Sequence, residues 1–441
     1  MSSLFKILLV FILITNCTTN KNKKYFWSKN KIIEEKKSNI KEIFKKELEL
    51  DDEFNPNLKI KLKSKAINKS FLNNLNNNNG LINYNGKFKK ISKYKFSKIE
   101  NFYQYDPKIS FNNGNVTFFD NKGFIFNFDK NSNLLWKKNY YPKNERKKKP
   151  ILFFENDGKT LIVVDNIANY YALDIKTGEL LWSKENTAPF NSQIKIYKDK
   201  FFVIDFENTL KAYSIKNGKE IWNIKTQNSL IRSQKKLSLA IKGENIFFNN
   251  SLGDVSAVKI SSGELLWQIP TQSTLVYDEG FFLQNSDIVI DEDSLYFSNN
   301  KNQFFSIDIN TGRLNWKQKV NSNLRPTIID SYIFTITLEG YLVVIEKNFG
   351  NIIRINDLFK IFDKKYLLED KKIKHNIVPI GFIVVKDNIY LATSKGKLHI
   401  VNIANGKTVK ILKIDNKKIS RPSVLNQDLF ITTENSIIRL N

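Results

Sequence analysis

The segment VSAVKISSGELLW at residues 255–267 and the segment YYALDIKTGELLW at residues 170–182 are two versions of one pattern. Each begins with apolar, β-branched or aromatic residues, which predict a β-strand. A short turn ending in glycine follows, and glycine supplies the positive φ that a tight hairpin turn requires. An aliphatic pair and a tryptophan then begin a returning strand. The pattern therefore predicts a β-hairpin that recurs along the chain.

Five more segments follow the same pattern. They are FIFNFDKNSNLLW (124–136), LKAYSIKNGKEIW (210–222), FFSIDINTGRLNW (304–316), LVVIEKNFGNIIR (342–354) and LHIVNIANGKTVK (398–410). A further strand is expected before each hairpin, as at KTLIVVD (159–165), with a short apolar piece before that, as at RPTIID (325–330). Four strands per unit and a period of roughly 40–50 residues are typical of the blades of a β-propeller.

The end of the chain indicates how the ring closes. The eighth unit stops at Asn441, where its glycine turn and fourth strand should follow. An open ring would leave unpaired strand edges, so we expect the missing strand to come from GKFKKISKYKF (86–96). The prediction is an all-β, eight-bladed propeller of four-stranded antiparallel blades over residues 86–441, closed by an N-terminal strand.

Tryptophan ends five of the seven hairpins. We expect these rings to pack between neighbouring blades, where each buries a large apolar area; the alternative is that they line a ligand site. They are Trp136, Trp182, Trp222, Trp267 and Trp316. The last two hairpins carry Arg354 and Lys410 instead, which predicts looser contacts there.

The composition limits the chemistry that the chain can perform. One cysteine excludes an intramolecular disulfide, and two histidines without histidine or cysteine neighbours make a zinc or haem site an unexpected feature. No metal and no cofactor are predicted, and His399 is interpreted as a structural residue of a strand. The net charge of +26 has two readings: an anionic partner, or a lysine-rich composition spread over the surface.

The first residues resemble an export signal. An apolar run from Ile7 to Ile14 follows Lys6 and is too short to span a bilayer. The stretch Leu13-Ile14-Thr15-Asn16-Cys17 resembles a bacterial lipobox, which predicts a signal peptide at 1–16 and lipidation of Cys17; the alternative is a cysteine within an ordinary signal peptide. Residues 17–85 are interpreted as a lipid-anchored tether and partly ordered arm, with a low-complexity loop, LNNLNNNNG, at 72–80.

The repeat resembles that of quinoprotein-type propellers. Two families share it, the PQQ-dependent dehydrogenases and BamB, a lipoprotein of the outer-membrane β-barrel assembly machinery, and the resemblance covers roughly residues 100–441. The residues that carry it are Tyr171-Ala172-Leu173-Asp174, Thr177-Gly178 and Trp182. The segment 254–268 and the stretch Ser229-Leu230-Ile231-Arg232 resemble BamB in particular.

The resemblance to BamB implies contact residues and partners. It implies that Leu230, Ile231 and Arg232 contact the periplasmic POTRA domains of a BamA-like barrel protein, with Asp278 and Glu279 as weaker candidates. An ordinary strand start between blades is the alternative for the first three.

The implied function is that of a non-catalytic scaffold subunit of the outer-membrane assembly complex. It would be a monomer within a hetero-complex, lipid-anchored on the periplasmic face of the outer membrane, and would aid insertion of outer-membrane proteins, whose precursors are further partners. Nucleic acid is not an expected partner. The main alternative is a periplasmic PQQ-dependent dehydrogenase or quinone-binding propeller. A basic module for anionic lipid is a third reading.

A quinone dehydrogenase needs a calcium site of converging oxygen ligands and a carboxylate base. No nucleophile–base pair and no phosphate-binding loop stand out in this sequence. The carboxylates of Asp174 and Asp308 fall in turns and are interpreted as turn-stabilising residues. These observations favour the scaffold over the enzyme.

Overall fold

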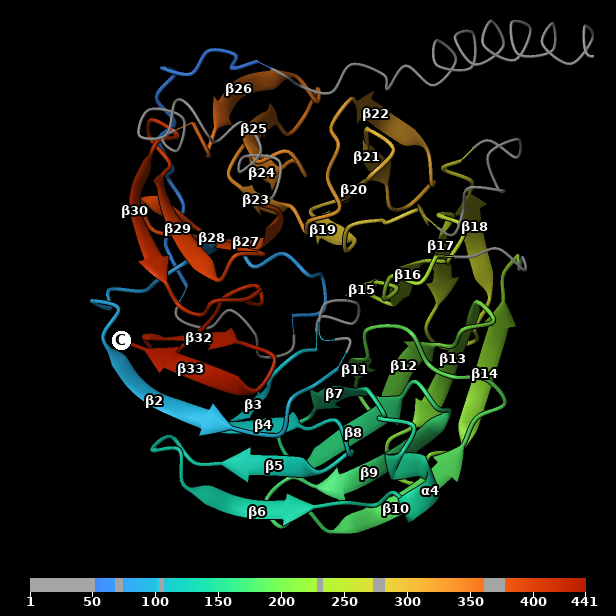
Figure 1. Cartoon of the computed structure of the whole chain (residues 1–441). Coiled ribbons are helices and arrows are strands. Elements are labelled where there is room, and N and C mark those ends of the chain that lie inside the picture. Colours follow the sequence, from blue (N-terminus) through green and yellow to red (C-terminus); the bar gives the residue numbers. More distant parts are fainter. Residues whose placement is uncertain are drawn as a thin grey trace, which may run out of the picture. The chain divides into compact units, whose positions relative to one another are not determined.

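The chain forms a ring of eight β-sheets (Figure 1). The structure is a computed structural model that describes residues 52–67, 74–100, 102, 107–227, 233–272, 282–360 and 377–441. Residues 50–441 make up one compact unit. In the described ranges, no helix has the length and apolar character needed to cross a membrane.

Each sheet is one blade, numbered here in chain order with its strands given from the centre of the ring outward. Blade 1 contains β3 (Ser110–Asn112), β4 (Asn115–Phe119), β5 (Ile125–Phe128) and β6 (Leu134–Lys138), and the short helix α4 (Lys143–Arg146) follows it. Blade 2 contains β7 (Leu152–Asn156), β8 (Thr160–Asp165), β9 (Asn169–Asp174) and β10 (Leu180–Glu185). Blade 3 contains β11 (Lys195–Tyr197), β12 (Lys200–Ile204), β13 (Thr209–Ser214) and β14 (Glu220–Lys225). Blade 4 contains β15 (Leu239–Lys242), β16 (Asn245–Asn249), β17 (Val255–Lys259) and β18 (Leu265–Ile269).

The other four blades complete the ring. Blade 5 contains β19 (Val289–Asp291), β20 (Ser294–Asn299), β21 (Gln303–Asp308) and β22 (Leu314–Gln318). Blade 6 contains β23 (Thr327–Ile329), β24 (Tyr332–Ile336), β25 (Tyr341–Glu346) and β26 (Ile352–Asp357). Blade 7 contains β27 (Pro379–Val385), β28 (Asn388–Thr393), β29 (Lys397–Asn402) and β30 (Thr408–Lys413), and β1 (Leu81–Ile82) pairs in parallel with β27. Blade 8 contains β31 (Ser423–Leu425), β32 (Asp428–Thr432), β33 (Ser436–Leu440) and β2 (Lys90–Lys95).

Blade 8 combines β2, which precedes blade 1 in the sequence, with the last three strands of the chain. Strand β2 pairs antiparallel with β33, with Tyr94 opposite Ile437. The predicted eight-bladed architecture and its closure by a strand within residues 86–96 are therefore confirmed. The closing strand carries Tyr94 into the core, where its ring meets Phe128 of blade 1.

The strand order gives the ring two unlike faces. The innermost strands begin on one face, where the connections from the preceding blade also arrive; we call this the loop face. On the opposite face, the turn face, the innermost strand turns back and the third strand turns into the fourth. The third and fourth strands of blades 1 to 7 all show a register shift next to this turn, which is the geometry of a β-bulge.

Each blade tryptophan reaches across to the turn of the following blade. In blade 3, the indole Nε1 of Trp222 donates a hydrogen bond to the Ile260 carbonyl of blade 4 at 3.0 Å. A Cβ on Gly263, at the blade 4 turn, would lie 2.7 Å from Cδ2 of this ring. The same pairing of indole with carbonyl occurs at Trp136, Trp182, Trp267 and Trp316, over Gly178, Gly218, Gly312 and Gly350 respectively.

The expectation of looser contacts is wrong at Arg354. This side chain is fully buried and its Nη1 donates to the Ala404 carbonyl of blade 7 and to the Leu58 carbonyl, both at 3.0 Å. Burial lowers the pKa of Arg354 to about 10. The arm accounts for the difference, because Leu58 supplies an acceptor to Arg354 and Phe54 forms an antiparallel bridge with Ile355.

We predict that Gly263→Ala destabilises the ring more than Gly243→Ala. Both glycines of blade 4 have positive φ, +75° and +59°, but a Cβ at Gly243 would meet nothing within 4 Å. The control variant, Gly243→Ala, should lose about 1–2 kcal/mol of the free energy of unfolding from backbone strain. The Gly263→Ala variant should lose about 1–3 kcal/mol more, because the methyl group displaces Trp222. Urea unfolding followed by tryptophan fluorescence measures both, and equal losses would contradict the packing of Trp222 against this turn.

We also predict a pH dependence of stability that originates at His399. This residue of β29 is buried against Phe359, and burial, with a smaller effect from Lys397, lowers its pKa from 6.5 to about 4. The unfolded state therefore binds the proton more readily, so stability present above pH 6.5 is lost as the pH falls toward 4. Between pH 7.5 and pH 5 the wild-type chain should lose about 2 kcal/mol more than His399→Leu. Urea unfolding at the two pH values tests this, and parallel losses would assign the acid sensitivity to other groups.

Candidate functional site

The candidate site is the central channel of the propeller, which the N-terminal arm crosses. Residues 74–82 run past the inner strands of blades 4 to 7, and the corresponding blue chain passes through the middle of the ring in Figure 1. The innermost strand of a blade has no neighbouring strand on its inner side, so its backbone groups need other partners. The arm supplies them, since the amides of Ile241 and Ile290 donate to the carbonyls of Leu75 and Asn76 at 2.7 and 2.9 Å.

Asn77 joins three blades. Its Nδ2 donates to the carbonyls of Leu239 in blade 4 and Ile288 before blade 5, each at 2.8 Å. Its Oδ1 accepts from Nζ of Lys195 in blade 3 at 2.6 Å. Asn78 continues the series at blade 6, where its amide group both donates to and accepts from the backbone of Ile328. Residues 74–80, the described part of the asparagine-rich stretch predicted as a loop, thus lack regular secondary structure and form a floor in the channel.

Lys195 points into this floor and is 4% exposed. Its Nζ donates to the Asn74 carbonyl and to Asn77 Oδ1, both at 2.6 Å. Burial lowers the pKa of Lys195 well below its usual value, and the positive charges of Lys108 and Arg325 lower it further. The floor therefore holds a desolvated amine whose only described acceptors belong to the arm.

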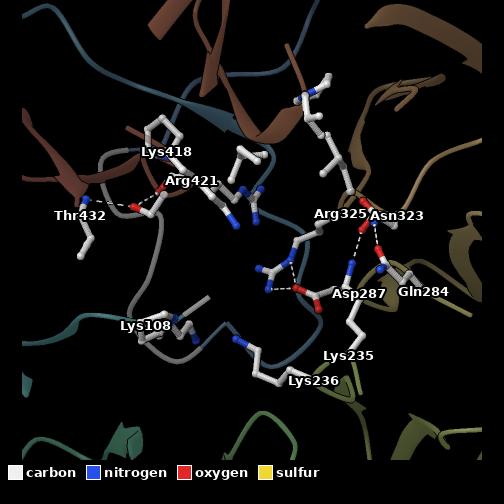
Figure 2. Close-up of a pocket in the computed structure, with 18 of the residues that line it drawn as sticks. Lys108, Lys235, Lys236, Gln284, Asp287, Asn323, Arg325, Lys418, Arg421 and Thr432 are labelled. Carbon is white, nitrogen blue, oxygen red and sulfur yellow. Dashed lines mark hydrogen bonds and ion pairs between the residues drawn. The ribbon is translucent and has the colours of Figure 1, made fainter. Parts of the chain in front are cut away.

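Above the floor lies a cavity of about 380 Å³, which opens at the loop face. Most of the residues that line it precede or begin the inner strands of seven blades. Its cationic side chains are Lys108, Lys235, Lys236, Arg325, Lys418 and Arg421. Figure 2 shows Lys108, Lys236, Arg325 and Arg421 directed toward the middle of the cavity. Among the described lining residues, Asp287 is the one carboxylate.

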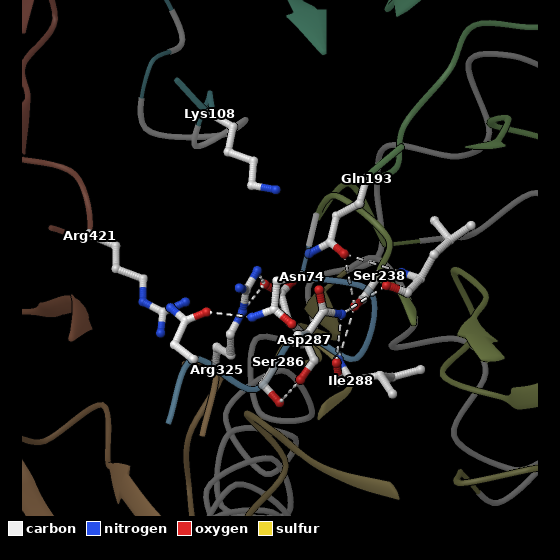
Figure 3. A network of polar contacts seen from close by, with 12 residues as sticks. Asn74, Lys108, Gln193, Ser238, Ser286, Asp287, Ile288, Arg325 and Arg421 are labelled. Atoms are coloured by element: carbon white, nitrogen blue, oxygen red, sulfur yellow. Dashed lines mark hydrogen bonds and ion pairs between the residues drawn. The ribbon is translucent and has the colours of Figure 1, made fainter. Parts of the chain in front are cut away.

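Six of the lining residues occupy one repeated position. In seven blades the inner hairpin closes with the same register, as in Ile329 opposite Tyr332 and Leu425 opposite Asp428. Four residues before the last residue of each inner strand lie Lys108, Gln193, Ser238, Asp287, Arg325, Gly381 and Arg421. Figure 3 shows six of these residues gathered around the channel. At Gly381 a Cβ would lie 2.7 Å from Cβ of Arg421, so the absent side chain leaves room for the arginine.

These charged residues were not predicted as a site, because the lysines were interpreted as scattered over the surface. The signal that identifies them is a charged or amide residue at the same offset before the inner hairpin of five blades. This offset can be recognised only after the inner strands have been aligned with one another. Several of these strands span three residues.

Asp287 and Arg325 form the central ion pair of the cavity. Nε of Arg325 donates to Oδ2 of Asp287 at 2.7 Å, and Nη2 contacts the same oxygen. Burial alone would raise the pKa of Asp287, but the positive charges of Arg325, Lys236 and Lys235 outweigh burial and hold that pKa below its usual range. The cavity is thus a region of positive potential.

The predicted contact and lipidation residues lie outside the described residues: Cys17, Leu230, Ile231, Arg232, Asp278 and Glu279. The described residues that flank the two contact segments are close together. Ser233 Oγ donates to the Leu283 carbonyl at 2.5 Å, which joins the end of segment 228–232 to the end of segment 273–281. Both segments precede inner strands, so their described flanks lie at the loop face beside the cavity.

No group of three or more histidine, cysteine, aspartate or glutamate side chains that could hold a metal ion occurs within the described ranges. Asp174 and Asp308 lie at the third-to-fourth strand turns. Each accepts hydrogen bonds from the backbone N–H groups two and three residues later, at 2.8 to 3.1 Å. These bonds lower the pKa of both carboxyl groups and identify both residues as turn residues.

Comparison with known proteins agrees with this architecture. The sequence profile described as outer membrane protein assembly factor BamB matches residues 121–356, more than half of the chain. No curated protein sequence matches. The crystal structure of BamB from Moraxella catarrhalis superposes with a TM-score of 0.62 at 16% identity, covering 80% of this chain and 100% of that one.

Dehydrogenases share the fold as well. A europium-containing methanol dehydrogenase has a TM-score of 0.60 at 10% identity, covering 82% of this chain and 89% of that chain. The quinohemoprotein alcohol dehydrogenase from Comamonas testosteroni has a TM-score of 0.58 at 8% identity, covering 80% and 76%. At these identities the structural similarities establish the fold alone.

We predict that Asn77→Ala destabilises the propeller by about 2–4 kcal/mol, because it removes buried hydrogen bonds to three blades and leaves the Lys195 amine short of an acceptor. The exposed Asn348→Ala serves as a control and should change stability by less than about 0.5 kcal/mol.

The double variant Asn77→Ala/Lys195→Met should be more stable than Asn77→Ala, since no buried amine is left without its acceptor. Urea unfolding of the four proteins measures these differences. An Asn77→Ala variant as stable as Asn348→Ala would show that the arm does not support the ring.

Proposed function

The chain belongs to the family of outer membrane protein assembly factor BamB, and we propose on that basis that it is a non-catalytic scaffold subunit of an outer-membrane protein assembly complex. It binds the periplasmic POTRA domains of a BamA-like barrel protein and aids insertion of outer-membrane proteins. The family match over residues 121–356 is the observation that carries this proposal. The propeller provides a rigid ring for such a role, because every blade is tied to the next through buried contacts.

The proposed contact surface is the loop face around segments 228–232 and 273–281. Ser233 Oγ donates a hydrogen bond to the Leu283 carbonyl, and Gly253 of blade 4 lies beside the same site, since a Cβ there would meet Leu283 at 2.8 Å. The described ends of the two segments are therefore held as one unit. This supports Leu230, Ile231 and Arg232 as contact residues, with Asp278 and Glu279 as weaker candidates.

The proposed location is the periplasmic face of the outer membrane, with an acyl anchor on Cys17. The lipobox-like stretch ending at Cys17 and the family membership support it. An acyl anchor would hold the protein on the membrane surface without a spanning segment.

The second candidate function is a quinone-dependent dehydrogenase or a quinone-binding propeller. Its support is the fold shared with the methanol and alcohol dehydrogenases. Visible quinone absorbance in the purified protein, together with calcium-dependent alcohol oxidation, would favour this candidate over the scaffold.

We predict that the mature chain, beginning after Cys17, binds the purified POTRA domains of the BamA-like protein from the same organism. The double variant Ile231→Asp/Arg232→Glu should weaken binding by about 30-fold or more, as expected when an apolar anchor and a cation of an interface are both replaced. Surface plasmon resonance at moderate salt measures the affinities.

The matched control is Lys176→Glu/Leu181→Asp in blade 2. It makes the same change in charge at two exposed residues, and it should leave the affinity within about twofold of wild type. If both double variants weaken binding to the POTRA domains equally, the contact site does not lie in segment 228–232. No binding by the wild-type chain would contradict the scaffold proposal itself.

A further inference from the structure

The cavity at the centre of the ring carries more positive than negative charge. Six cationic side chains and one carboxylate line it among the described residues. The cations come from opposite sides of the channel, with Lys108 before blade 1, Lys236 before blade 4, Arg325 before blade 6 and Arg421 before blade 8 (Figure 2). Convergence of like charges in a partly desolvated space is unfavourable unless an opposite charge occupies it.

The electrostatics within the cavity agree with this excess. Asp287 is bound by Arg325 and still lies within the field of Lys235 and Lys236, which contribute to lowering its pKa. Lys195 in the floor has its pKa lowered by Lys108 and Arg325 as well as by burial. Nζ of Lys108 lies 3.6 Å from a carboxylate oxygen of Glu155, which does not line the cavity. Asp287 and Glu155 therefore offset part of the positive charge, and the positive charges of Lys108 and Arg325 still act on Lys195.

The shape of the cavity fits a small molecule. Its volume of about 380 Å³ falls within the ~300–1,000 Å³ typical of ligand sites. The arm gives the channel a floor, because Asn77 joins blades 3, 4 and 5 beneath the cavity. A ligand therefore enters from the loop face and stops at the floor.

The polar groups suit carboxylate or phosphate oxygens. Guanidinium groups present a planar fork that matches both anions, and lysine adds point charges that adapt to either. The side-chain amides of Gln193, Gln234, Gln284 and Asn323 also line the cavity and offer further N–H donors. Gly381 widens the wall where the Arg421 side chain passes.

We propose that the central cavity binds a small multivalent anion, a molecule with at least two carboxylate or phosphate groups. This site lies on the ring axis and goes beyond the scaffold function, on which it does not depend. An acidic segment of a partner protein is the competing occupant, and the enclosed floor and the modest volume favour the small molecule.

Isothermal titration calorimetry of the full mature chain at low ionic strength tests the proposal. The probes are pyrophosphate and citrate, with acetate at the same ionic strength as a monovalent reference. We expect saturable binding of one anion per chain for pyrophosphate, citrate or both, and none for acetate. Tighter binding of pyrophosphate would indicate a phosphate ligand, and tighter binding of citrate would indicate a carboxylate ligand. The affinity for either probe should fall as salt is added.

Two cavity variants and one control locate the site. Lys108→Gln and Lys236→Gln should each weaken binding about tenfold or more, because each removes a charged partner of the anion. Lys219→Gln removes the same charge from an exposed turn residue on the turn face and should leave affinity unchanged. Thermal unfolding of each variant confirms that it is folded. Because two separate lysines are replaced, one variant still tests the site if the other does not fold.

Three results would overturn the proposal. The first is no saturable binding of either multivalent probe to the wild-type chain. The second is equal weakening by Lys219→Gln and the cavity variants, which would indicate attraction by overall charge. The third is binding of an acidic peptide that neither probe displaces, which would assign the cavity to a partner protein.

Discussion

The ring depends on one contact between neighbouring blades, the tryptophan of one hairpin against the turn glycine of the next. The indole Nε1 donates to a carbonyl at the next turn, and its ring lies where a Cβ on that glycine would be, as at Trp222 and Gly263. Blades 1 to 5 therefore each supply a tryptophan to the blade after them, and blades 2 to 6 each supply a glycine to the blade before them. A sequence that repeats both residues at fixed spacing specifies a chain of identical interfaces, which closes when eight blades complete the circle.

The tryptophan–glycine contact is absent where blades 6 and 7 meet the blades that follow them. Blades 6 and 7 carry Arg354 and Lys410 at the tryptophan position, and the chain compensates with residues from outside the repeats. Arg354 donates to Leu58, and Phe54 forms a bridge with Ile355. Near Lys410 the ring of Phe88 lies 5.4 Å from the amine. The described residues of the arm thus pack as part of the propeller at interfaces where the repeat lacks its tryptophan.

The fold could be predicted from the sequence because its determinants are local and periodic. The hairpin pattern fixes the blade, and the missing strand after Asn441 fixes the closure by residues 86–96, as β2 confirms. The floor of the channel could not be predicted, because Asn77 finds its partners 118 to 211 residues away and no period marks them. The cationic cavity was missed for a related reason: Lys108, Arg325 and Arg421 are unremarkable until the register of the short inner strands places them at one level. The candidate contact residues Leu230 to Arg232 remain proposals, since they lie outside the described residues.

The two faces of the ring differ because the arm occupies one of them. On the turn face the arm meets the glycine-turn region and the inner hairpins, as where Ile60 N donates to Ala404 and Lys63 N donates to Asp330. On the loop face the cavity opens, and the described ends of segments 228–232 and 273–281 lie beside its rim. An open propeller channel could be approached from either side, whereas a channel with a floor has one entrance. A partner that binds the proposed contact segments would therefore stand beside the opening of the cavity on the loop face.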